Sequence, residues 1–106
     1  MTDPRYTSLA HTLIHYSCEL QAGEKLLIEA IDTPSAFTRE LVRVAHEAGV
    51  IPNVLLKNNE VLRRLLLGAT DEQLDLMAAS EETYMKGVDA YIGVRGAPNV
   101  LSLIHI

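Results

Sequence analysis

Apolar residues along this chain occur in two patterns, helical spacing and short continuous runs. Residues 5–20 carry apolar side chains at positions 9, 13, 16 and 20, which predicts an amphipathic helix. The segment Lys25–Ile31 is almost continuously apolar, as is typical of a strand buried on both faces of a parallel sheet. Ile51–Lys57 predicts a second strand, with Pro52 at its start, where a missing N–H donor is tolerated. A third run, Asp89–Val94, predicts a third strand.

The segment between the first two runs predicts the clearest helix. Its apolar residues recur at i, i+4, i+7, i+8 and i+11, at Phe37, Leu41, Val44, Ala45 and Ala48. We expect Asp32 or Thr33 to cap this helix and Pro34 to be its first residue. Gly49 is expected to end it.

Three short helices are predicted between the second and third runs. The first, over NNEVLRRLLLGA, ends at Gly68. The second begins at Thr70, which stands three residues before Gln73 at the spacing of a capping box. Ser80 is expected to cap the third, over EETYMKG. The predicted order is therefore α-β-α-β-α-α-α-β.

This order predicts a small α/β domain of two or three layers, with a mainly parallel sheet of about three strands and right-handed helical crossovers. At 106 residues the chain is one domain at most, and we interpret it as an incomplete part of a larger one. The loops 31–34, 57–60 and 95–99 are expected at the carboxyl edge of the sheet, where open α/β sheets bind ligands.

Composition narrows the function classes. The net charge is −5 and no basic stripe occurs, which argues against direct nucleic-acid binding because phosphate neutralisation supplies most of the affinity of such proteins. Cys18 is the single cysteine, so no internal disulfide can form. No signal-peptide pattern is evident, and no apolar run reaches the ~18 residues of a membrane span. We therefore expect a soluble, cytoplasmic chain.

His11, His15 and Cys18 form the best local candidate for a metal site. Their spacing of i, i+4 and i+7 places them within an arc of about 60° on one helix face, and these side chains can ligate a soft divalent metal. Thr12 stands where a zinc-protease motif has its general base. We favour the alternative that the two histidines lie on the solvated face and Cys18 at its border.

Two carboxylates and one hydroxyl are further candidates. Glu29 and Asp32 lie at the end of the first strand and can act as catalytic carboxylates, although capping and solvation are the favoured roles. Ser35 is a conceivable nucleophile, but no base lies near it in the sequence, and helix initiation is the favoured role.

The remaining candidates carry weaker signals. His46 stands in the last turns of its helix, where a cation suits the helix dipole, and His105 lies in the C-terminal tail. Gly93 and Gly96 belong to no phosphate-binding motif, since neither a P-loop nor G-x-G-x-x-G occurs. Local chemistry thus assigns no catalytic, cofactor-binding or metal residue.

Three colinear segments carry a family resemblance over about residues 3–100. They are DPRYTSLAHTLIHYSCELQAGEKLLIEA, LVRVAHEAGVIPNVLL and DEQLDLMAASEETYMKGVDAYIGVRGAPN. Together they resemble the N-terminal part of the thermophilic-type metallo-aminopeptidases, peptidase family M29.

The resemblance implies a cytoplasmic, metal-dependent exopeptidase that removes N-terminal residues from peptides. Members of this family are longer, two-domain chains that form homodimers. Their pair of divalent metals (Zn, Co, Mn or Mg) is held in the C-terminal domain, where a polarised water attacks the scissile carbonyl. No segment here corresponds to those metal-binding segments, so no catalytic residue is carried over.

On this interpretation, residues 1–100 are the N-terminal α/β domain of such an enzyme, which walls the active-site cavity and supports assembly. The fragment alone is expected to lack the metal site and to be inactive, and residues 101–106 are interpreted as a truncated or non-native tail. The alternative is a stand-alone α/β ligand-binding or interaction domain that uses the carboxyl-edge loops. A small independent hydrolase would need a site that the sequence does not display.

Overall fold

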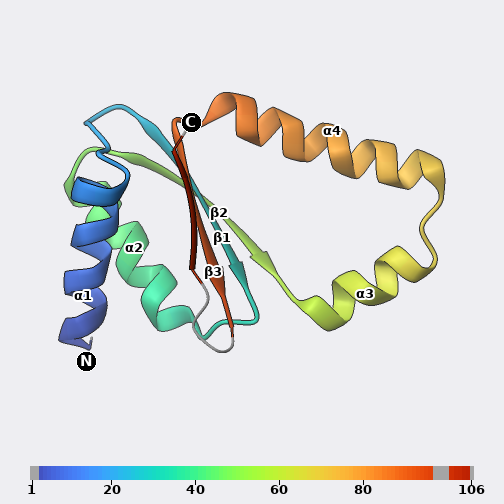
Figure 1. The fold of residues 1–106 in the computed structure, drawn as a ribbon, viewed down its shortest axis with the longest axis horizontal. Coiled ribbons are helices and arrows are strands. Elements are labelled where there is room, and N and C mark those ends of the chain that lie inside the picture. The colour runs from blue at the N-terminus through green and yellow to red at the C-terminus, as the bar shows by residue number, and fades with distance from the viewer. Residues whose placement is uncertain (1–2, 97–100, 106) are drawn as a thin grey trace.

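Four strands form one sheet in the order β2-β1-β3-β4 in the computed structural model, which describes residues 3–96 and the backbone of 101–105 (Figure 1). The strands β1 (Lys25–Ile31), β2 (Ile51–Lys57) and β3 (Ala90–Arg95) are parallel. This arrangement confirms the predicted α/β class and its parallel strands. The predicted bounds of β1 and β2 agree with the structure, while β3 begins and ends one residue later than predicted.

A fourth strand, β4 (Leu101–His105), pairs antiparallel with β3 and was not predicted. In the register of this pair, Tyr91 stands opposite Ile104 and Ile92 opposite Leu103. The pairing gives the backbone groups along that edge of β3 hydrogen-bond partners, which an open edge lacks. The structure does not describe the side chains of this segment, including that of His105. The interpretation of residues 101–106 as a truncated or non-native tail stays a prediction.

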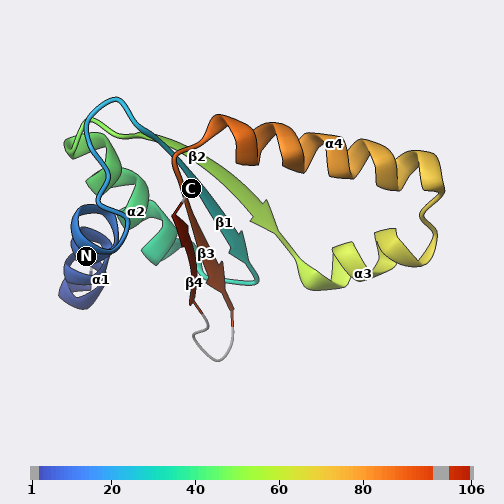
Figure 2. The same ribbon diagram turned by 45° about the horizontal axis from the view of Figure 1, so that its top comes forward.

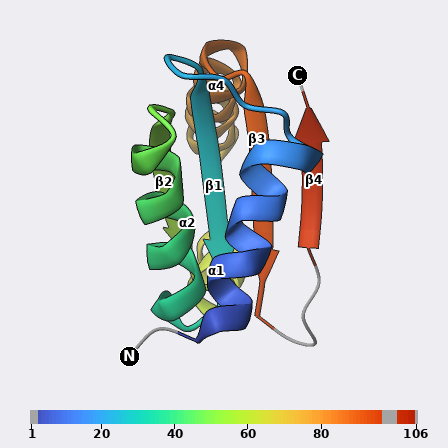
Figure 3. The same cartoon turned by 90° about the vertical axis from the view of Figure 1, so that its left-hand side faces the viewer.

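One face of the sheet is covered by two helical segments. The first is α1 (Pro4–His11), which continues as the π-helix η1 (Thr12–Ser17), and the second is α2 (Ser35–Glu47). Figure 3 shows α1 and α2 side by side in front of β1. The main core lies between this layer and the sheet, and its largest fully buried side chains are Ile14, Leu26, Ile28, Leu41, Ile92, Val44 and Cys18.

The predicted apolar stripe of the first helix is wrong in part, because Leu9 and Tyr16 are 41% and 76% exposed. Ile14 and Cys18 are buried instead. From Thr12 on the segment is a π-helix, in which the Cys18 N–H donates to the Leu13 carbonyl at 2.9 Å, five residues back. Ile14 and Cys18 lie four residues apart on the face that meets the sheet, so Cys18 packs in the core rather than at the border of the solvated face.

The prediction for α2 is confirmed along its stripe, where Leu41, Val44 and Ala45 are buried. Its start differs, since Pro34 is the N-cap and the helix begins at Ser35. Pro34 is in extended conformation at ψ 148°, as a cap residue is, and no side chain caps the helix. The predicted caps Asp32 and Thr33 therefore lie in the preceding loop.

The helices α3 (Asn59–Leu67) and α4 (Asp71–Gly87) form a hairpin that extends away from the sheet (Figures 1 and 2). The Thr70 cap is confirmed, because its hydroxyl oxygen accepts from the Gln73 N–H at 3.2 Å. The predicted start of a separate helix at Ser80 is wrong. The helix α4 is continuous over 17 residues, and Ser80 is an exposed residue in its interior. Neither helix contains a buried residue.

Within residues 3–96, the other face of the sheet is covered where the C-terminal end of α4 reaches it. Leu27, Val88 and Tyr91 form a small buried cluster there, with Tyr84 and Met85 of α4 packed against it. None of the helices within residues 3–96 combines the length and the apolar character needed to cross a bilayer. The sheet thus presents one face packed by α1, η1 and α2 except along β2, where Leu56 is 76% exposed, and one face that remains open beside α4.

Candidate functional site

The loops after the three parallel strands meet at the carboxyl edge of the sheet, as predicted. The Asp32 N–H donates to the Lys57 carbonyl at 3.1 Å, and the Asp32 carboxylate accepts from the Asn59 N–H at 3.1 Å. Gly96 packs so closely on this turn that a Cβ there would lie 2.1 Å from the Asp32 carbonyl oxygen. Asp32 therefore does not cap α2; its carboxylate binds the first N–H of α3, whose N-cap is Asn58. Residues 97–99 of the third loop lie outside the described residues.

A hollow of about 370 Å³ opens on the less covered face of the sheet, beside α4; we call it the carboxyl-edge hollow. Alternate residues of the strands point into it because side chains on a strand alternate between the two faces. Its lining combines apolar and charged side chains: Leu27, Glu29, Leu55, Lys57, Glu81, Tyr84, Met85, Tyr91 and Arg95.

Glu29 is the centre of a charged group in this hollow, and we call Glu29, Lys57, Tyr91 and Arg95 the Glu29 cluster. One carboxylate oxygen lies 2.9 Å from the Lys57 Nζ. The other accepts from the Tyr91 hydroxyl at 3.0 Å and lies 3.3 Å from an Arg95 Nη atom. The second Nη of Arg95 donates to the Tyr91 hydroxyl oxygen at 3.3 Å. The cluster thus joins all three parallel strands.

Gly93 makes the Tyr91 contact possible. A Cβ at this position would lie 2.7 Å from the Tyr91 hydroxyl oxygen, so the phenol lies across the glycine to reach Glu29. The strand glycine thus accommodates a side chain of its own strand.

The charges of the cluster shift its protonation equilibria. Burial alone raises the pKa of Glu29, but hydrogen bonds from Lys57 and Tyr91 and the charge of Arg95 outweigh it, so this pKa lies below its ordinary value. For Lys57, burial lowers the pKa, and the contact with Glu29 more than reverses this, so its pKa is raised. Burial is the main reason that the pKa of the Tyr91 phenol is raised. Glu29 and Lys57 are therefore an ion pair at neutral pH.

Glu81 of α4 stands at the rim of the hollow. Its carboxylate lies 3.5 Å from the Lys57 Nζ, and its side chain is 62% exposed, against 15% for Glu29. An exposed pair at this distance contributes little to stability. Glu81 is thus a loosely held second carboxylate at Lys57.

The residues singled out for metal binding do not come together. The rings of His11 and His15 stack with centroids 5.5 Å apart, while Cys18 is buried in the core. Across residues 3–96, no three His, Cys, Asp or Glu side chains are grouped in a way that can hold a metal ion. His46 and Ser35 are both exposed, at the last turn and the first residue of α2.

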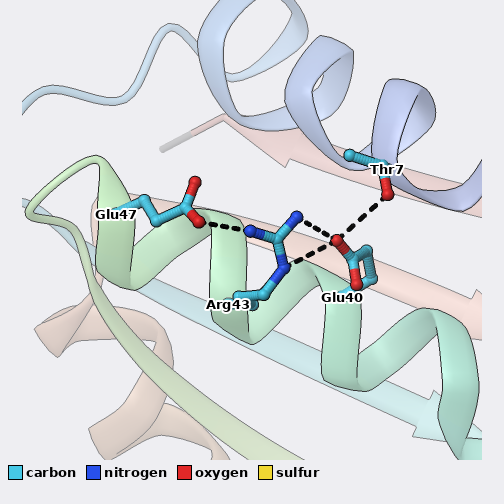
Figure 4. A network of polar contacts seen from close by, with 4 residues as sticks. All are labelled: Thr7, Glu40, Arg43 and Glu47. Carbon is cyan, nitrogen blue, oxygen red and sulfur yellow. Dashed lines mark hydrogen bonds and ion pairs between the residues drawn. The ribbon is translucent and has the colours of Figure 1, made fainter. Parts of the chain in front are cut away.

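A second polar network joins α1 to α2 (Figure 4). Arg43 donates to the Glu40 and Glu47 carboxylates, and the Thr7 hydroxyl donates to Glu40 at 3.1 Å. The hydrogen bond from Arg43 is the main reason that the pKa of Glu40 lies below its ordinary value. Glu40 is 4% exposed, and Arg43 supplies the counter-charge that a buried carboxylate needs. This network joins the two helices.

Sequence reasoning named Glu29 but missed its partners Lys57, Tyr91 and Arg95. A signal existed, because Glu29 interrupts an apolar strand and is therefore expected to need a buried counter-charge. The partners themselves stand 28 residues or more away along the chain; Tyr91, for example, is 62 residues from Glu29. Only the parallel register of the sheet brings them together.

Comparison with known proteins gives one finding. The family described as thermophilic metalloprotease (M29) matches residues 2–106. Neither a curated protein nor a solved structure matches the chain. Since the match spans nearly every residue, including all three parallel strands and the Glu29 cluster, the chain belongs to the M29 family of metallopeptidases.

Proposed function

We propose that this chain is the N-terminal α/β domain of a metal-dependent aminopeptidase, which removes N-terminal residues from peptides in the cytoplasm. The observation that carries the proposal is the M29 match over residues 2–106. The exopeptidase specificity, the location and a homodimeric assembly are part of the proposal and follow from the family resemblance.

The M29 family implies a divalent metal, and the described residues do not fit one. The carboxylate best placed in the hollow, Glu29, is already bound by Lys57 and Arg95. A metal ion there would meet two cations, and no third His, Cys, Asp or Glu side chain joins Glu29 and Glu81 within the described part of the chain. We therefore propose that the metal pair (Zn, Co, Mn or Mg) is held by segments other than these.

The role of the domain is to wall the active-site cavity and to support assembly. Its open sheet face carries the carboxyl-edge hollow, at the edge where α/β sheets present residues to ligands. The covered face supplies rigidity, because α1 and α2 pack there on the main core. The chain's own residues thus shape and support a site, and none of them is assigned a catalytic step.

A peptidase assay tests the proposal. The purified chain is incubated with amino-acid chromogenic substrates, with and without added Zn²⁺, Co²⁺ or Mn²⁺, and we expect no metal-stimulated release. Cleavage that depends on metal would show that the site lies within this chain and would contradict the assignment of the metals elsewhere.

The gene offers an independent test. We expect the DNA downstream of codon 106 to contain an open frame encoding segments rich in His, Glu and Asp. Expression of the chain joined to that segment is expected to give metal-dependent release of N-terminal residues. An extended protein that cleaves only internal peptide bonds would overturn the aminopeptidase assignment.

A further inference from the structure

The carboxyl-edge hollow contains more positive charge than its inner side chains neutralise. Lys57 and Arg95 both contact the one carboxylate of Glu29, which leaves an inner charge of +1. The second carboxylate, Glu81, comes from the rim and is the more exposed and more distant partner of Lys57. With Glu81 included the charged lining is neutral, so a further anion is suited to the Glu29 cluster where it displaces Glu81 from Lys57.

Hydrogen-bond donors also remain in the cluster. The guanidinium of Arg95 has five N–H groups, and its contacts in the described structure are one with Glu29 and one with Tyr91. The Lys57 ammonium has three N–H groups and contacts Glu29 and Glu81. Since both cations touch the same carboxylate, they flank one point of the hollow. An acceptor entering from the open side meets donors from two strands.

The wall beside these charges is apolar. Leu27 and Leu55 line it from the sheet, and Tyr84 and Met85 line it from α4. A ligand that satisfies both parts of the lining has a carboxylate next to an apolar side chain. Such a group occurs in an apolar amino acid and at the C-terminus of a peptide that ends in one. A phosphate lacks the apolar part and would leave this wall uncovered.

We propose that the carboxyl-edge hollow is a binding subsite for the carboxylate of an apolar amino acid or peptide C-terminus. The ligand carboxylate takes the place of Glu81 at Lys57 and accepts from the remaining N–H groups of Arg95. The apolar side chain packs against Leu55 and Met85. This inference concerns binding alone and does not depend on the proposed peptidase activity.

The test measures binding to the full chain by ¹H–¹⁵N NMR titration or calorimetry in metal-free buffer. The probes are N-acetyl-leucine, its amide N-acetyl-leucinamide, and the dipeptide Ala-Leu. We expect saturable binding of N-acetyl-leucine and Ala-Leu, and at least about tenfold weaker binding of the amide, because the amide lacks the charge that Lys57 and Arg95 recognise. Binding of the dipeptide but not of N-acetyl-leucine would assign the site to peptide C-termini and support the proposal in that form.

A matched pair of surface variants separates the site from general charge effects. Glu81→Gln removes the competing carboxylate and is expected to tighten N-acetyl-leucine binding about three- to tenfold. Glu82→Gln makes the same charge change one residue away, on a side chain that is also 62% exposed and pairs with Lys86, and is expected to leave binding unchanged. Both glutamate side chains are exposed, so both variants are expected to fold as the wild type does.

Lys57→Gln completes the experiment and is expected to weaken binding at least about tenfold. Three results would overturn the proposal. They are the absence of saturable binding of both N-acetyl-leucine and Ala-Leu to the wild-type chain, equal binding of N-acetyl-leucine and its amide, or equal tightening of N-acetyl-leucine binding by Glu81→Gln and Glu82→Gln. Because no turnover is measured, these results are distinguishable from a failure of the proposed aminopeptidase activity.

Discussion

Glu29 is a charged residue in the strand β1, between β2 and β3, and the groups around it determine the free-energy cost of burying its carboxylate. An isolated carboxylate at 15% exposure would be costly. Lys57 and Arg95 from the two neighbouring strands offset this cost. The Glu29 cluster therefore contributes to stability only while Glu29 is ionised.

Glu29→Gln is expected to lower the free energy of unfolding at pH 7 by about 1–2 kcal/mol, because Lys57 and Arg95 lose their counter-charge. The folded-state pKa of Glu29 is depressed, so its stabilisation is complete above the ordinary carboxyl pKa of about 4.3 and is lost as pH falls through the lower folded value. Urea denaturation at pH 7 and pH 3 measures this. The difference between wild type and variant should shrink in acid, and an equal difference at both pH values would contradict the ion-pair account.

Two glycines of the third strand region differ in what a methyl group would meet. At Gly96 the nearest atom is the Asp32 carbonyl oxygen, 2.1 Å away, whereas at Gly93 it is the end of the Tyr91 side chain, 2.7 Å away. A backbone carbonyl group held in a turn moves less easily than the end of a side chain does. We expect Gly96→Ala to cost about 2–4 kcal/mol and Gly93→Ala less, at about 1–2 kcal/mol.

Thermal unfolding of both glycine variants, with Gly87→Ala as the control, checks this order. No atom lies within 4 Å of a Cβ at Gly87, so that change should be neutral or slightly stabilising. A Gly93→Ala variant less stable than Gly96→Ala would show that the turn around Asp32 yields more easily than its contacts indicate.

At the scale of elements, α2 and α4 are anchored very differently. The helix α2 contributes Leu41, Val44 and Ala45 to the main core, while α4 has no buried residue and reaches the sheet only near its C-terminal end. Helices of this kind gain most of their stability from packing of an apolar face. We therefore expect global unfolding to be governed by α2 and not by α4.

Leu41→Ala is expected to cost about 2–4 kcal/mol, because the side chain is fully buried and its removal leaves a cavity. Leu76→Ala, at a side chain 72% exposed on α4, is expected to change stability by less than about 0.5 kcal/mol. Denaturant unfolding of the two variants measures the contrast. A cost at Leu76 close to that at Leu41 would mean that α4 is packed in solution.

At the scale of the whole molecule, large apolar side chains are exposed on the hairpin of α3 and α4. The most exposed are Leu67 and Leu76, both at 72%, followed by Val61 at 66% and Leu66 at 53%. Apolar patches of this kind promote association. The molecule is therefore expected to self-associate as its concentration rises.

The double variant Leu67→Lys/Leu76→Lys is expected to reduce this association without lowering the melting temperature, because neither side chain is buried. Sedimentation velocity over a tenfold concentration range measures it. Ser17→Lys/Ser80→Lys adds the same charge at two exposed serines and should leave association largely unchanged. Equal effects of the two double variants would assign the change to charge rather than to apolar surface.

Elements with strong local signals could be predicted, whereas the candidate site could not. Each of the predicted features depends on residues that are near one another in the sequence. These features are the apolar runs of β1 and β2, the apolar stripe of α2 and the Thr70 cap. By contrast, Thr12–Ser17 is wound as a π-helix that ends at the buried Cys18, and α4 continues through Ser80 without a break. Neither feature has a distinctive local pattern.

By itself, the sequence determined the alternation of helices and strands, the parallel class of the sheet and the resemblance to the M29 family, because these depend on hydrophobic spacing and on colinear motifs. Only the tertiary structure decided that Glu29 meets Lys57, Tyr91 and Arg95, and that β4 pairs with β3. The physical reason is that strand pairing joins residues far apart in the chain. The register of the strands depends on how whole elements pack, so the residues next to each partner in the sequence do not indicate which residues will pair.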